Sequence, residues 1–584
     1  MPLACDIETD GLDATVITAL CWIDIETGEE HDCGPDIEAG LRTLMDYDGE
    51  LVFHNGVDFD LPVIQELYDW FEPKHPIVDT LVLSRLAYQD MLGHDMGLWD
   101  NKTMKLLDRR ARIGSHGLAT WGVRLRMAKH VYVDDNDEWP DHYTKRLGEY
   151  CLQDCRVTRR LYGHLMQQPL SPVAVELEHA FSAAMRAVRV RGFAFDVEAA
   201  EDLWQTLSDK VAMIEHELVG TFGGWYAPVG EPVVPKRSVK YKDKPHVTEG
   251  VPYQKVAYTV FNPQSRAHID KVLQDRGWEP DVFTPTGQAK VDEDTLRKIA
   301  DRWPEAGLLA DHFMLQKRRA LLLSWREAQQ YGRVNAQIIP NATITGRTSS
   351  RAPNFQQVPR VGSPYGKECR ALFTASPGRV LLASDLDRAE LTMLAHYLDD
   401  DGAYGELLQT ADIHQVNADR MGITRNQMKG VQFGFIYGAG DAKLGEMTGL
   451  PGAEVRERLY AAIPGLSDLI AKVQKDSEQG YIVSIDGRHI PVAKKHTALN
   501  YLIQSATSSV AKRWAVNCWQ AMLDMRCDLC LYVHDELQFD CDPALTERAG
   551  EIVRESLRES NDYFKVTTPL TCDLQQGANW SESH

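Results

Sequence analysis

The stretch GRVLLASDLDRAELTMLAHY, residues 378–397, decides the fold, because a short apolar strand in it leads directly into a helical pattern. Asp385 ends the apolar strand, and Glu390 lies in the helical pattern that follows. A carboxylate at a strand end is held by a rigid element and still reaches solvent, which suits coordination of a divalent metal. The alternative role for Asp385 is the N-cap of the next helix, which needs no metal.

A second acidic segment, LCLYVHDELQFDCD at residues 529–542, lies far downstream. It places His534, Asp535 and Glu536 between two apolar runs, as at the tip of a β-hairpin. The alternative is a polar turn without a chemical role. The presence of both acidic segments in one chain, with the helix described next between them, favours a functional site.

That helix is predicted by TRNQMKGVQFGFIYGAG, residues 424–440, in which Thr424 and Gln427 match a capping box. Two cations and then two aromatic residues recur at intervals of four, so their side chains follow one face of the helix. The cations lie at the positive end of the helix, which suits a triphosphate, and the aromatic rings suit stacking on a base or sugar. The alternative is a solvated basic turn followed by buried aromatic residues. The four residues are Arg425, Lys429, Phe433 and Tyr437.

A separate acidic set lies in the first part of the chain. Asp6 and Glu8 are two residues apart in an extended apolar run, so both carboxylates lie on one face of a strand. Asp60 follows in HNGVDFDLPVI, and Tyr150 and Asp154 lie one helical turn apart in EYCLQDCRVTRRL. Four carboxylates at one point repel one another unless divalent metals neutralise them, as in a two-metal phosphodiester hydrolase. Tyr150 then orients the attacking water, because its hydroxyl both donates and accepts.

Composition excludes several classes of protein. The chain has 584 residues, enough for about four domains of ordinary size. Its 43% hydrophobic and 25% charged residues are typical of globular proteins, and its net charge of −22 argues against nucleic-acid binding over the whole surface. We expect no secretory leader and no membrane span. The 11 cysteines favour a reducing cytoplasm over a disulfide scaffold, and the CxxC of Cys527 and Cys530 favours packing over zinc binding.

The three segments at the strand, the helix and the hairpin resemble motifs A, B and C of family A DNA polymerases, in order and at the expected separations. The ordered DxE, NGxxxD and YxxxD set resembles the proofreading 3′–5′ exonucleases of the DEDD superfamily, in the subtype with a tyrosine before the last aspartate. The family pattern favours Asp60 over Asp58 as a ligand and leaves Asp79 as a supporting or structural residue. Within family A, the chain is most similar to the replicative polymerases of T-seven-type phages.

This resemblance implies an α/β multidomain fold, in which a ribonuclease H-like exonuclease domain precedes a right-hand polymerase. The predicted divisions are an exonuclease domain at 1–170, a thumb at 171–330, a first palm part at 331–400, fingers at 401–480 and a second palm part at 481–584. The thumb carries a short basic insertion near 224–262, which we expect to form an exposed loop or hairpin.

The resemblance also implies roles for individual residues. Asp385, Asp535 and the neighbouring Glu536 are the catalytic acids of the polymerase site, where Asp385 and Asp535 bind two Mg²⁺ ions, with Mn²⁺ as a substitute. The four exonuclease acids, Asp6, Glu8, Asp60 and Asp154, are implied to bind two further Mg²⁺ ions. Glu390 crowds the sugar 2′ position, Phe433 disfavours dideoxynucleotides because it lacks a phenolic hydroxyl, and Tyr437 packs near the template base. The triphosphate is neutralised by His414, Arg425 and Lys429, and the primer-template is contacted by Arg347, Arg370, Gln504 and His534.

The implied partners are primer-template DNA and deoxynucleoside triphosphates, with a replisome helicase-primase by analogy and no membrane. Phage relatives carry a long thumb insertion that captures host thioredoxin as a clamp, whereas the insertion near 224–262 is much shorter, which argues against thioredoxin. The basic segment 233–246 either contacts duplex phosphates or is a solvated loop. Asp387 and Thr392 stand in motif A where the family commonly has serine and arginine, and their effect stays open.

Two other functions remain as alternatives. One is a 3′–5′ exonuclease whose C-terminal part binds DNA without polymerising it. The other is a single-subunit RNA polymerase, which normally lacks both an exonuclease and a glutamate at the position of Glu390. We expect a cytoplasmic protein, in the bacterial host cytoplasm if a phage encodes it.

Overall fold

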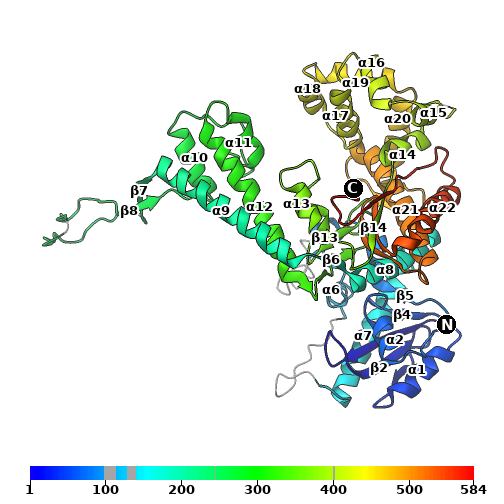
Figure 1. Cartoon of the computed structure of the whole chain (residues 1–584). Coiled ribbons are helices and arrows are strands. Elements are labelled where there is room, and N and C mark those ends of the chain that lie inside the picture. The colour runs from blue at the N-terminus through cyan, green and yellow to red at the C-terminus, as the bar shows by residue number, and fades with distance from the viewer. Residues whose placement is uncertain (98–112, 128–139, 244, 399–400) are drawn as a thin grey trace. The chain divides into compact units, whose positions relative to one another are not determined.

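The computed structural model describes residues 1–97, 113–127, 140–243, 245–398 and 401–584 (Figure 1). These residues form two compact units. The first comprises Met1–Ala194, Arg333–Gln357 and Phe373–His584, and the second comprises Phe195–Gly332 and Val358–Leu372. Over the described ranges, no helix has both the length and the apolar character needed to cross a membrane. The division into exonuclease, thumb, palm and fingers stays a prediction.

The N-terminal part of the first unit is built on a five-stranded sheet. β1 is its central strand, antiparallel to β2 and parallel to β4, and α7 packs against β1 and β2. The register of β1 and β2 shifts between Glu8 and Thr9, at the end of β1. In sheet order the strands are β3 (Glu30–Asp32), β2 (Ile17–Asp24), β1 (Leu3–Thr9), β4 (Leu51–Phe53) and β5 (Val78–Asp79), and the nearby helices are α1 (Ile37–Asp46), α2 (Asp60–Leu67), α3 (Thr80–Ala87) and α7 (Lys145–Leu165).

A second sheet of the first unit holds the strand quoted at the start. Its β14 (Val380–Asp385) lies between β18 (Glu536–Cys541) and β19 (Gln575–Gly577), and β17 (Cys527–Val533) completes the sheet beside β18. All the pairings are antiparallel. The turn between β17 and β18 therefore confirms the hairpin expected from residues 529–542. A disulfide joins Cys527 of β17 to Cys541 of β18, which the antiparallel register sets opposite each other.

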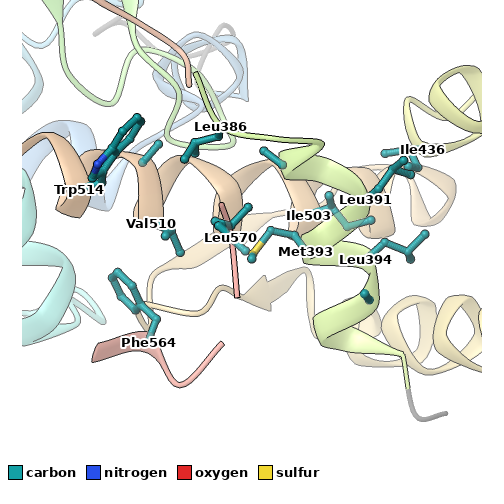
Figure 2. Close-up of a cluster of buried hydrophobic side chains, with 14 of the residues drawn as sticks. Leu386, Leu391, Met393, Leu394, Ile436, Ile503, Val510, Trp514, Phe564 and Leu570 are labelled. Carbon is teal, nitrogen blue, oxygen red and sulfur yellow. The ribbon is translucent and has the colours of Figure 1, made fainter. Parts of the chain in front are cut away.

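Helices cover this sheet and form the largest buried core. α14 (Ala389–Tyr397), α21 (Ala498–Ala521) and α22 (Thr546–Phe564) contribute the central side chains, as Figure 2 shows for Leu391, Ile503 and Phe564. The Trp514 ring is fully buried, and its indole N–H donates to the Val553 carbonyl at 2.9 Å, which joins α21 to α22. Burial of so many apolar side chains fixes the sheet on which the acidic residues stand.

Six helices between α14 and residue 480 extend the same core. They are α15 (Ala403–Thr410), α16 (Ile413–Met421), α17 (Arg425–Ile436), α18 (Asp441–Thr448), α19 (Gly452–Ala462) and α20 (Leu466–Asp476). α17 begins with the predicted capping box: the Thr424 hydroxyl accepts from the Gln427 N–H, and the Gln427 side chain accepts from the Thr424 N–H. This cap satisfies backbone donors at the first turn and fixes where the helix begins.

A buried ionic network links α8 (Pro172–Arg191) to α21 and to the turn before β16 (His489–Pro491). The Glu178 carboxylate accepts from Arg488 at 2.7 Å and from Lys512 at 2.6 Å, and all three side chains are almost completely buried. Arg488 also pairs with Asp486, so the network holds two cations and two anions. Burial lowers the pKa of Lys512 to about 8, although the Glu178 charge opposes this shift. Removal of any member leaves a buried charge without its partner.

The second unit is a helical bundle with a long hairpin. The bundle consists of α9 (Val197–Phe222), α10 (Arg266–Gln274), α11 (Glu293–Ile299) and α12 (Pro304–Ala328), and α13 (Gly366–Ala371) belongs to the same unit. β7 (Gly224–Pro228) pairs with β8 (Val256–Val260), and this pairing begins a hairpin that leaves the bundle beyond α9 (Figure 1). We name residues 224–260 the basic arm, and its form confirms the expected exposed hairpin. Its described lysine and arginine residues between the strands are Lys236, Arg237, Lys240, Lys242 and Lys255.

Candidate active sites

Strand pairing brings together the acids of the two acidic segments, residues 378–397 and 529–542. Asp385, the last residue of β14, is the register partner of Glu536, the first residue of β18. Asp535 lies in the turn just before β18, and its carbonyl accepts from the Leu386 N–H at 3.1 Å. Acids 150 residues apart in sequence therefore meet at one edge of the sheet.

The electrostatics of this edge match a site for divalent cations. Burial raises the pKa of Asp385 to about 8, and the charges of Asp535, Glu536 and Asp573 add to the shift. Burial and the Glu390 charge raise the pKa of Asp535 to about 6. Buried carboxyls whose pKa is raised further by neighbouring carboxylates are stabilised in their charged form when a hard cation binds the group.

Asp573 is an acid of this site that our reading of the sequence missed. Its carboxylate accepts from the Asp385 N–H at 3.0 Å, and its own N–H donates to the Asp385 carbonyl. The extra acid of motif A, Asp387, accepts instead from the Thr571 hydroxyl at 2.9 Å. The C-terminal segment therefore engages both acids. The only sequence signal was an aspartate just before the short strand β19.

Glu536 is held by structural hydrogen bonds. Its Oε1 accepts from the Gln538 amide at 2.8 Å and from the Trp580 indole N–H at 2.5 Å, and the His584 ring lies 3.4 Å from its Oε2. The side chain is buried. These contacts fix its position beside Asp385.

The Glu390 carboxylate accepts hydrogen bonds from two of the other predicted site residues. Its Oε1 accepts from the Arg347 guanidinium at 2.7 Å and from the Tyr437 hydroxyl at 2.9 Å. Glu390 lies in the first turn of α14, and Tyr437 caps the end of α17, so this contact connects the two helices that flank the acidic edge. The carboxylate is thereby held in one position.

The face of α17 presents cations and an aromatic ring as predicted from the spacing. Lys429 is exposed and makes no ion pair with any residue in the described ranges, and Arg425 pairs with Asp412 at 2.6 Å. The ring of His414, on α16, lies 5.9 Å from the Phe433 ring. Its Nδ1 is within 2.6 Å of the Gln432 amide oxygen, and burial lowers the pKa of the imidazole. Gln432 is a positioning residue that the sequence did not reveal.

The remaining predicted DNA contacts lie in two places. Gln504, on α21, accepts from the Thr345 hydroxyl at 3.4 Å. His534 lines a small cavity with Arg347, Tyr532 and Asp535, and burial lowers its pKa. Arg370 belongs to the second unit, where it lies in α13 and its Nε donates to the Pro359 carbonyl at 3.0 Å.

The first acidic set also comes together. Ligand oxygens of Asp6, Glu8 and Asp154 all lie within 4.8 Å of one another, and these residues come from β1 and α7. Asp60, at the start of α2, is buried, and its carboxylate accepts from the Ile7 N–H at 3.4 Å. Burial raises its pKa to about 7, with further contributions from Asp79 and Asp154. Three carboxylate oxygens this close suit a hard divalent cation.

The two acids left out of the ligand set have other partners. The Asp79 carboxylate accepts from the backbone N–H groups of Asn55, Val57 and Leu81, so it caps α3 and fixes the preceding loop. Asp58 pairs with Arg189 of α8 at 2.9 Å.

Comparison with known proteins agrees with this geometry. Residues 234–582 match DNA polymerase family A. The DNA-directed DNA polymerase of Enterobacteria phage T3 is 29% identical over 100% of both chains, and that of Escherichia phage T7 is 29% identical over 99% of both. The solved POL domain of Pol1 from M. smegmatis, in complex with DNA primer-template and dNTP, has a TM-score of 0.75 at 18% identity and covers 100% of this chain and 96% of its own.

The family match and the fold shared with this solved domain define a polymerase of the right-hand class. The chain belongs to DNA polymerase family A. The predicted family and the predicted fold class are therefore confirmed.

Proposed function

We propose that this chain extends a primer 3′ end along a DNA template with deoxynucleotides, in the replication of a phage genome. The observation that carries the proposal is the β14–β18 register, which sets Asp385 and Asp535 at one edge of the palm sheet. Family A DNA polymerases use divalent metal ions. Asp385 and Asp535 fit two such ions, Mg²⁺ or in its place Mn²⁺, because burial raises the pKa of both carboxyls and a bound cation would stabilise their charged form.

Bound divalent ions supply an activated primer hydroxyl and stabilise the charge that develops on the leaving pyrophosphate. The protein residues position the reactants. Lys429, Arg425 and His414 bind the triphosphate, and Lys429 is exposed for that contact. Arg347, Arg370, Gln504 and His534 contact the primer-template, while Asp573 and Glu536 support the two carboxylate ligands.

Sugar selection follows from the fixed position of Glu390. Its carboxylate is held by Arg347 and Tyr437, so it cannot swing aside for a ribose 2′ hydroxyl. Steric exclusion at this point favours deoxynucleotides. Phe433 offers no hydroxyl to replace a missing 3′ hydroxyl, which disfavours dideoxynucleotides.

A second activity is favoured by a separate observation, the close grouping of Asp6, Glu8 and Asp154. We propose that these residues and Asp60 hold two divalent ions and remove mispaired 3′ nucleotides by hydrolysis. The Tyr150 hydroxyl, one helical turn before Asp154, orients the attacking water. Proofreading then uses a site separate from synthesis.

The basic arm is proposed to contact duplex DNA. Its five described lysine and arginine residues form no ion pair with any described residue, and the net charge of the whole chain is −22, so this is a local positive surface on an acidic protein. The basic arm is much shorter than the thumb insertion that captures thioredoxin in phage relatives, so we expect DNA synthesis that does not depend on thioredoxin. A helicase-primase is the replisome partner proposed by analogy, and the bacterial cytoplasm is the proposed place of action.

Incorporation of one labelled nucleotide onto a primer-template tests the polymerase proposal. Wild-type protein is expected to add deoxynucleotides and to discriminate against ribonucleotides. The Asp385→Asn variant is expected to add neither kind of nucleotide. A chain that shortens DNA but adds no nucleotide would be an exonuclease with a non-polymerising DNA-binding module. Efficient ribonucleotide addition would favour an RNA polymerase.

A further inference from the structure

A cavity of about 40 Å³ lies inside the first unit, beside the candidate exonuclease site. Its walls come from the loop after β4, from α3, from α8 and from β11 (Gln337–Ile339). The volume exceeds that of one water site, which needs roughly 10–15 Å³ by the same measure. The polar residues that line it include Asp58, Asp79, Arg85, Arg186 and Arg189.

The charge of this cavity is positive. Three arginines face two aspartates, and both aspartates already have partners: Asp79 accepts from three backbone N–H groups, and Asp58 pairs with Arg189. Among the described residues, neither Arg85 nor Arg186 has a hydrogen bond or an ion pair, and the buried Nε of Arg186 lacks an acceptor. Partly buried guanidinium groups without an acceptor are costly, and they suit an anion that supplies one.

The cavity adjoins the exonuclease acids through a short segment of chain. In HNGVDFD, residues 54–60, Asn55 and Val57 bond to Asp79 of the cavity wall, Asp58 lines the cavity, and Asp60 accepts from the Ile7 N–H between Asp6 and Glu8. An anion in the cavity is therefore held next to the metal ligands. Planar guanidinium groups match the paired oxygens of a phosphate.

We propose that this cavity binds a backbone phosphate of a single-stranded DNA 3′ end whose terminal nucleotide occupies the exonuclease site. The inference rests on the proposed exonuclease activity. Arg85 and Arg186 are positioning residues: they hold the strand, while the acids and Tyr150 act on the terminal bond. A free nucleoside monophosphate, the product of that reaction, carries the same chemical group and is the competing ligand.

Binding of a labelled single-stranded oligodeoxynucleotide tests the proposal without any cleavage. The protein is the full chain with Asp6→Ala, in buffer with EDTA. Adding Arg85→Gln and Arg186→Gln together is expected to weaken binding at least about tenfold and, because one phosphate is bound, to reduce the slope of log affinity against log salt by about 0.7. Arg160→Gln, an exposed arginine of α7 away from the cavity, is the matched control and is expected to bind as its parent does.

A second probe uses the unmutated arginines, so it does not depend on how the double variant folds. Oligonucleotides with one neutral methylphosphonate linkage, moved stepwise from the 3′ end, are expected to lose affinity at one linkage only, and the double variant is expected to be indifferent to that linkage. In the chain with Asp6 intact, the double variant is expected to raise KM for single-strand degradation, to leave kcat nearly unchanged and to extend a matched primer normally.

The outcomes separate the two proposals. Equal oligonucleotide binding by parent and double variant, or no linkage-specific loss, would overturn the cavity assignment. Weaker inhibition by a nucleoside monophosphate with unchanged oligonucleotide binding would assign the cavity to the product and overturn the strand assignment. Arginine-dependent binding in a chain that never degrades DNA would overturn the exonuclease proposal and leave the phosphate site standing.

Discussion

Binding of Mg²⁺ to metal-free protein should release protons, and the structure predicts how many. Asp385 has a pKa of about 8, Asp535 of about 6 and Asp60 of about 7. At pH 7 these values leave Asp385 about 0.9 protonated, Asp535 about 0.1 and Asp60 about 0.5. Metal ligands must be deprotonated, so these three carboxyls are expected to release about 1.5 protons per chain when metal saturates the protein at pH 7.

The pH dependence has a definite sign. All three pKa values are raised, so the metal-free carboxyls are more protonated at neutral pH than ordinary aspartates are, and they lose these protons as the pH rises through the folded-state values. The release on binding therefore falls with rising pH, to about 0.1 proton at pH 9.

Asp385→Asn isolates the palm contribution. It is expected to reduce the release at pH 7 from about 1.5 protons to about 0.6, while Glu547→Gln, an exposed acid at the start of α22, is expected to change nothing. The assay is titration calorimetry with Mg²⁺ in two buffers of different ionisation enthalpy. An enthalpy independent of the buffer, or an unchanged release from Asp385→Asn, would refute the account of the palm acids.

Three further predictions concern other parts of the chain. Phe433→Tyr should raise dideoxynucleotide incorporation about ten- to a hundredfold in a chain-termination assay, because the added hydroxyl supplies one hydrogen bond; an unchanged termination pattern would count against the placement of this ring. Replacing Lys236, Arg237, Lys240 and Lys242 of the basic arm with serine should reduce the salt slope of duplex binding, measured by anisotropy, by up to about 3.6. An equal slope would show that these side chains do not contact phosphates. Glu178→Ala should lower the free energy of unfolding by about 3–5 kcal/mol in chemical denaturation, whereas the exposed Glu176→Ala should cost less than about 1 kcal/mol; similar losses would contradict the buried network.

Short-range patterns in the sequence predicted local structure well. The capping box of Thr424 and Gln427, the hairpin around Asp535 and the strand that ends at Asp385 all depend on neighbouring residues, and the structure confirms them. The same holds for Asp6 and Glu8, whose spacing places them on one face of β1.

Contacts between residues far apart in the sequence could not be predicted from local sequence patterns. Asp573 joins Asp385 only because β19 pairs with β14, and no local periodicity encodes that pairing. The Cys527–Cys541 bond follows from the β17–β18 register in the same way. The hydrogen bond between Gln432 and His414 likewise forms only because α17 packs against α16. The roles of the site residues stay predictions.

The most direct test of the account is a labelled primer-template incubated with Mg²⁺, with and without deoxynucleotides. Wild-type protein, Asp535→Ala and Asp6→Ala are compared on one gel. The account predicts that wild type extends the primer, that Asp535→Ala only shortens it, and that Asp6→Ala only lengthens it. Extension by Asp535→Ala at the wild-type rate would contradict the assignment of the palm site.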